Sequence, residues 1–158
     1  MLSLTQINKA VNDLLKKKTN AETYSNEVLE GFRTPCFFTS CRIADMETVS
    51  QNNFLVKAVV SIIFVPDTQQ MKRVRSESYN NKMASLLIGL FLPNIKVEDR
   101  TLTVSRISTD FVGENSDLLR FNFTTEYYDS FDISDEETKL LIEEIFLQGE
   151  INTGKEDF

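Results

Sequence analysis

Apolar residues recur every three or four positions in two stretches of the chain, a spacing typical of amphipathic helices. The first stretch runs to about residue 17 and begins with Ser3 and Gln6 in the spacing of a capping box. The second covers roughly 68–91 and ends before Pro93. The stripe predicted for burial in this second helix comprises Met71, Val74, Met83, Leu86, Leu87, Leu90 and Phe91.

Alternating apolar and polar residues predict strands between and after these helices. We expect a short strand near 23–28, a second over 36–44 and a long third over 54–65. Both faces of the third become apolar toward its C-terminal half, so a helix or a neighbouring subunit should cover each side there. A further strand pair is predicted, with 95–97 leading into 101–109, and then 118–128 after a turn at 113–117.

The polar segment 45–53 predicts the tip of a hairpin. It could be a contact finger in an assembly, or an exposed turn with no role. The candidate assembly contacts in this tip are Met46, Thr48, Ser50, Asn52 and Asn53.

A second capping box, Ser134 with Glu137, predicts a C-terminal helix. Its apolar positions are Leu140, Leu141, Ile145 and Phe146, and residues 149–158 should form a flexible acidic tail. The predicted order is therefore α-β-β-β-α-β-β-α. We predict one α+β domain over residues 1–148, with a mainly antiparallel sheet and helices packed on one of its faces.

Negative charge is concentrated at the C-terminal end of the 158-residue chain. Residues 134–158 hold eight acidic residues and two lysines, whereas the remainder holds sixteen acidic and fifteen basic residues. This balance disfavours sequence-independent binding to DNA, and the basic residues near Lys72 are best explained as a solvated helix face. No apolar run approaches the ~20 residues of a membrane span.

The residues that usually perform catalysis are missing or have simpler explanations. The chain has no histidine and no Gly-rich phosphate-binding motif. Cys36 and Cys41 are five residues apart, which places them on opposite faces of a strand as free thiols. The acidic residues at 135–137 and 143–144 could bind Mg²⁺, but acidic residues early in a helix are also expected from its dipole. We therefore predict no enzyme activity, cofactor or metal.

Two segments carry a resemblance to a known family. The helix sequence LTQINKAVNDLL at 4–15 is followed by Tyr24-x-x-Glu-Val-x-Glu-Gly-Phe-x-x-Pro-Cys-Phe-Phe38. This pattern resembles the tail-terminator family of phages and prophage-derived tail particles, in which an amphipathic helix leads to a strand, a Gly-containing turn and an aromatic strand. The residues that match the motif are Gly31, Phe32, Pro35, Phe37 and Phe38, which we interpret as shaping the turn and the core.

The resemblance implies a structural protein that caps the tail tube as a sixfold ring and ends its polymerisation. Implied partners are other copies of the chain, the tail-tube protein, and a sheath or head-connector protein; bacteriocin-like particles have no head. DNA could pass through such a ring without specific binding. Assembly would take place in the host bacterial cytoplasm. The alternatives are a head–tail joining, neck or tail-completion protein, a small Mg²⁺-dependent enzyme, or an intracellular adaptor.

Overall fold

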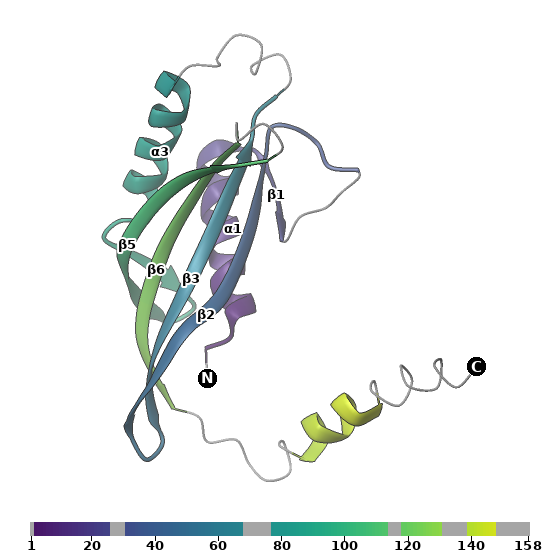
Figure 1. Cartoon of the computed structure of the whole chain (residues 1–158), viewed down its shortest axis with the longest axis vertical. Helices are drawn as coiled ribbons and strands as arrows, with labels where there is room; N and C mark the ends of the chain where they lie inside the picture. The colour runs from purple at the N-terminus through teal and green to yellow at the C-terminus, as the bar shows by residue number, and fades with distance from the viewer. Residues whose placement is uncertain (1, 26–30, 68–76, 114–117, 131–138, 148–158) are drawn as a thin grey trace, which may run out of the picture.

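The computed structural model describes residues 2–25, 31–67, 77–113, 118–130 and 139–147 (Figure 1). Its main elements occur in the order α1 (Leu4–Thr19), β1 (Glu22–Ser25), β2 (Cys36–Ser50), β3 (Asn53–Val65), α3 (Glu77–Phe91), β4 (Asn94–Val97), β5 (Arg100–Val112) and β6 (Leu118–Ser130). Residues 139–147 form a further helix. The structure confirms an α+β fold.

The six strands form one curled sheet in the order β1-β2-β3-β6-β5-β4 (Figure 1). Every neighbouring pair is antiparallel except β1 and β2, which run parallel. The mainly antiparallel sheet is thus confirmed. The centre of the sheet joins β3 to β6, which lie on either side of α3, β4 and β5 in the sequence.

Helix α1 has defined signals at both ends. At its N-terminus the Gln6 amide donates to Ser3 Oγ at 3.2 Å and the Ser3 amide donates to Gln6 Oε1 at 2.9 Å, so the predicted capping box is present. At its C-terminus Asn20 adopts a left-handed conformation with φ of 56°. The buried face of the helix consists of Ile7, Val11 and Leu15.

A single core joins α1 and α3 to one face of the sheet. The predicted alternation of β3 is correct, since Val56, Ala58, Val60, Ile62 and Phe64 are buried. The inward residues predicted for the last strand are buried as well, namely Leu119, Phe121, Phe123 and Tyr127. On α3, Leu87 and Phe91 enter this core, and the ring of Phe91 stacks on that of Phe123 with centroids 5.0 Å apart.

The predicted stripe of the second helix is only partly correct. Leu87 and Phe91 are fully buried, and Met83 and Leu90 pack partly buried against the core. Leu86 is 44% exposed, so its assignment to the stripe was wrong: α3 touches the sheet along a narrower line than the sequence indicated. Residues 68–76, with the remaining two stripe positions, lie outside the described residues.

Two strand predictions need correction. The run 95–109 is two strands, because a turn with Glu98 at a φ of 55° folds β4 back on β5, and the order therefore gains one strand. The predicted cover on both sides of β3 is not supplied by α1 and α3, which pack on the same face. On the opposite face Ile63 and Val65 remain half-buried.

The C-terminal helix at 139–147 is present, as predicted, but it does not share the core. Its six large apolar side chains are between 47% and 67% exposed. The prediction that helices pack on one face therefore does not extend to this helix. The capping box at Ser134 and the tail 149–158 lie outside the described residues.

Candidate assembly surface

The hairpin of β2 and β3 extends beyond the part of the sheet that the helices cover (Figure 1). Every residue from 42 to 53, which we call the arm, is exposed. The sequence predicted the tip of a hairpin over 45–53, and the hairpin is present. The extent of the tip needs correction, because β2 continues to Ser50 and only Gln51 and Asn52 form the turn. Hydrogen bonding to β3 keeps this polar segment extended, with register shifts at Ile43/Asp45 and Thr48/Ser50.

The five candidate contacts all lie on the arm, but they do not form a single cluster. Met46 and Thr48 are paired with Val56 and Phe54, so their side chains lie on the face of the sheet that also bears the core. Ser50 lies opposite Asn53, whose Nδ2 donates to Ser50 Oγ at 2.9 Å and closes the tip.

Exposed apolar side chains accompany these polar residues on the arm. Ile43 is 43% exposed, Met46 38% and Val49 56%. Sequence reasoning identified Met46 but not the other two, although the β-branched character of Ile43 and Val49 was a signal for strand. The arm thus combines extended backbone with three exposed apolar side chains.

Backbone along the edge of the arm has no strand partner among the described residues. β1 pairs with β2 only from Cys36 to Thr39, whereas β2 continues to Ser50. At the other edge, β4 pairs with β5 only from Arg100 to Thr103, although β5 continues to Val112. Open strand edges readily accept a strand from another chain.

The motif residues hold β1 against β2. Gly31 has a φ of +81°, a conformation that favours glycine, and the Thr34–Pro35 peptide is cis. The ring of Phe38 packs edge-on against Phe32 with centroids 5.3 Å apart, and Phe37 is fully buried. The role of these residues in shaping the turn and the core stays a prediction.

A hydrogen-bonded clamp between distant parts of the chain was not apparent from the sequence. The backbone amide of Leu2 donates to Asp129 Oδ2 at 2.7 Å, and Asp129 is only 4% exposed. The other carboxylate oxygen accepts from Arg100 Nη2 at 3.4 Å. The start of α1 is thereby tied to the end of β6, where Asp129 pairs with Phe54 near the tip of the arm.

The face of the sheet away from the helices carries polar pairs beside apolar side chains such as Val59 and Ile63. Asp110 accepts from Arg120 Nε at 2.9 Å, and this guanidinium lowers the pKa of the Asp110 carboxyl. Ser61 Oγ donates to Asn122 Oδ1 at 2.6 Å. Tyr128 stands out on this face with 66% of its surface exposed.

The two cysteines are free, as predicted. Burial raises the pKa of the Cys41 thiol to about 11 and also raises that of Cys36. Thiols that stay protonated are poor nucleophiles and poor metal ligands. Within the described ranges no three His, Cys, Asp or Glu side chains are grouped to hold a metal ion, and no helix is long and apolar enough to cross a membrane.

Comparisons with known proteins connect this chain to a protein family. The family model described as "Phage tail terminator protein" matches residues 6–139, which is most of the chain. No curated protein matches the sequence. A solved structure resembles this chain with a TM-score of 0.47 and 15% identity, over 85% of this chain and all of that one.

The family match confirms the resemblance found in residues 4–38 and extends it across the sheet. It agrees with a structural role in the phage tail and with contacts to other tail proteins, and the exposed arm suits such contacts. The chain belongs to the phage tail terminator family.

Proposed function

We propose that this protein caps the tail tube as a sixfold ring and ends tube polymerisation, with the arm as its main contact surface. The observation that carries the proposal is the arm itself. Twelve consecutive exposed residues, 42–53, project an open strand edge together with exposed Ile43, Met46 and Val49.

The two open edges of the sheet support a ring. The edge of β2 beyond Thr39 and that of β5 beyond Thr103 lie on opposite sides of the same sheet. A contact between two different surfaces of identical subunits is heterologous, and it gives a ring when the rotation between neighbours closes. The number six comes from the family resemblance.

The surface chemistry supports protein partners. The arm offers backbone hydrogen bonds and apolar side chains, which together allow a strand of another protein to be added. The partners we propose are other copies of this chain and the tail-tube protein, with a sheath or head-connector protein on the head-proximal side. The net charge of −7 suits a ring through which DNA passes without binding.

Electron microscopy of tails tests the proposal. Lysates would contain the wild-type chain, no chain, Met46→Asp, or Ile88→Asp as the matched control, because Ile88 on α3 is also 38% exposed. We expect overlong tubes without the chain and with Met46→Asp, and tubes of normal length with the control. A charge at Met46 should disrupt an apolar contact without unfolding the exposed arm.

Other outcomes would redirect or reject the proposal. Normal tubes that lack heads or sheath would indicate a neck or tail-completion role instead. Normal particles in the absence of the chain would refute a role in tail assembly altogether.

A further inference from the structure

The helix at 139–147 exposes an apolar stripe that no described residue covers. At 100° per residue, Leu141, Ile142, Ile145 and Phe146 lie on one side of the helix. Their exposed fractions range from 47% to 67%. A helix of this length is only marginally stable alone in water, so it needs a surface on which the stripe can pack.

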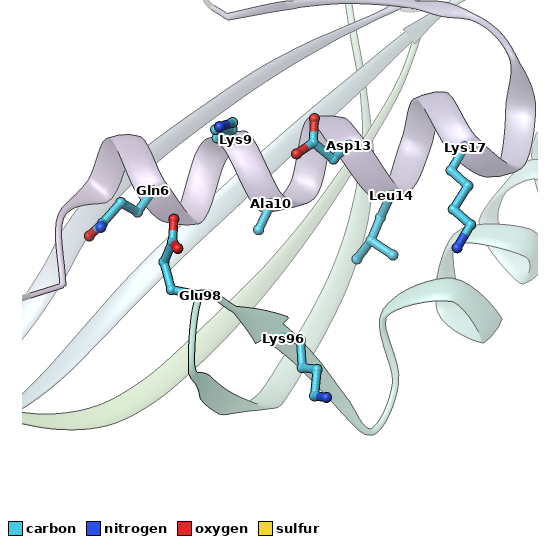
Figure 2. A pocket seen from close by; sticks show the side chains of 8 residues that line it. All are labelled: Gln6, Lys9, Ala10, Asp13, Leu14, Lys17, Lys96 and Glu98. Atoms are coloured by element: carbon cyan, nitrogen blue, oxygen red, sulfur yellow. The ribbon is translucent and has the colours of Figure 1, made fainter.

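A groove lies between α1 and the end of β4. It has a volume of about 390 Å³. In Figure 2, Ala10 and Leu14 project from α1 toward β4, with Lys17 beyond them and Lys96 on the opposite wall. Ala10 and Leu14 are only partly buried and form an accessible apolar strip in the groove. The rest of the lining is polar or charged and comprises Gln6, Lys9, Asp13, Lys17, Lys96 and Glu98. We call this the α1–β4 groove.

The lengths of the helix and the groove agree. The lining residues on α1 run from Gln6 to Lys17. At 1.5 Å per residue this stretch spans roughly 17 Å, and helix 139–147 spans roughly 13 Å. The helix can therefore lie along α1 over most of the groove.

The charges of the two parts are opposite. Helix α1 carries Lys9, Lys16, Lys17 and Lys18 against a single acidic residue, Asp13. The opposite wall of the groove adds one residue of each sign, Lys96 and Glu98, so the positive excess of α1 remains. Residues 134–158 carry eight acidic residues against two lysines. When the apolar stripe faces the groove, Glu143 and Glu144 lie on opposite sides of the helix, each about 60° around the helix axis from the nearest residue of the stripe. Long lysine side chains can reach them there.

We propose that helix 139–147 of one copy docks in the α1–β4 groove of a neighbouring copy. Its stripe packs on Ala10 and Leu14, and its carboxylates pair with the lysines of α1. No described residue of the same chain covers the helix or the groove, which favours a second copy as the occupant. This docking adds a second contact between neighbours beside the open strand edges, and it rests on the proposed ring.

Disulfide trapping between singly substituted full-length chains tests this docking. One chain carries Leu14→Cys and the other carries Phe146→Cys with a distinguishable tag, so a disulfide joining the two can form only between copies. The control replaces Leu14→Cys by Ile88→Cys, because Ile88 is 38% exposed on α3 and lies neither on the arm nor in the lining of the groove. We expect trapping roughly tenfold or more above this control, because docking raises the local concentration of the pair.

Charge reversal provides a second test. Lys17→Glu should reduce the trapping, and Glu143→Lys with Glu144→Lys in the tagged chain should restore it. A chain carrying both Leu14→Cys and Phe146→Cys reveals docking within one copy. A disulfide confined to that single chain would overturn the proposal, and so would trapping no greater than the control.

Failure of the docking and failure of the ring can be told apart. Tail length and native mass spectrometry report the ring independently of the disulfide. Rings of normal composition without trapping would reject the exchanged helix and leave the capping function intact. Overlong tubes and dispersed subunits with the substituted chains would identify a defect in ring formation itself.

Discussion

Phe91 is the residue on which the attachment of α3 depends most. It is fully buried and lies against Phe123 and Phe121, with centroid distances of 5.0 and 6.4 Å. A buried phenylalanine removes about 150–250 Å² from water, which corresponds to roughly 4–6 kcal/mol at 25 cal/mol per Å². Alanine keeps part of this area but leaves a cavity, so we expect Phe91→Ala to lower the free energy of unfolding by about 4 kcal/mol.

Urea unfolding followed by far-UV circular dichroism measures this loss, since the chain has no tryptophan. With a denaturant slope of about 2 kcal/mol per molar, the midpoint should fall by roughly 2 M. All samples need the same protein concentration because association adds to apparent stability. Leu86→Ala is the matched control on the same helix, and its 44% exposure predicts a loss below about 1 kcal/mol. Equal midpoints for Phe91→Ala and the control would refute the packing described for α3.

Four further predictions concern single residues. Asp129→Ala should cost about 2 kcal/mol in urea unfolding because it leaves the buried Leu2 amide without its acceptor. Arg100→Ala should lower the free energy of unfolding by less than about 1 kcal/mol, since that side chain is 39% exposed. Equal losses for Asp129→Ala and Arg100→Ala would contradict the hydrogen bond from Leu2 to Asp129 as the main contact of this clamp. Gly31→Ala should cost about 1–2 kcal/mol through its φ of +81° alone, because no atom lies within 4 Å of an added Cβ; an unchanged midpoint would contradict this conformation. Cys41 has a pKa raised to about 11, so iodoacetamide should label it slowly at neutral pH and faster as the pH rises toward that value; peptide mass spectrometry would expose fast neutral labelling.

Features encoded by nearby residues were predictable from the sequence. The capping box at Ser3 and Gln6 depends on three-residue spacing, and the buried positions Phe121 and Phe123 depend on strict alternation. The family motif at 24–38 is also local, and the family match over residues 6–139 agrees with it.

Features that depend on distant partners were not predictable. The polar arm became strand because β3 supplies hydrogen bonds across the hairpin, a contribution that propensity does not contain. The side chain of Leu86 follows the helical period, but the sheet meets α3 along a line that misses it. The hydrogen bond between Leu2 and Asp129 joins two residues that are far apart in the sequence, and no local sequence pattern predicts it.

The placement of β6 beside β3 also governs when the core can form during synthesis. β2 and β3 form a local hairpin, which pairs within about 1–10 μs once both strands exist. β3 can complete its other edge only after α3, β4 and β5 have been made and β6 has emerged. Closing that long segment is the slow step expected of non-local sheet pairing. A nascent chain thus holds a finished arm hairpin beside an unpaired strand edge until its last strand is released.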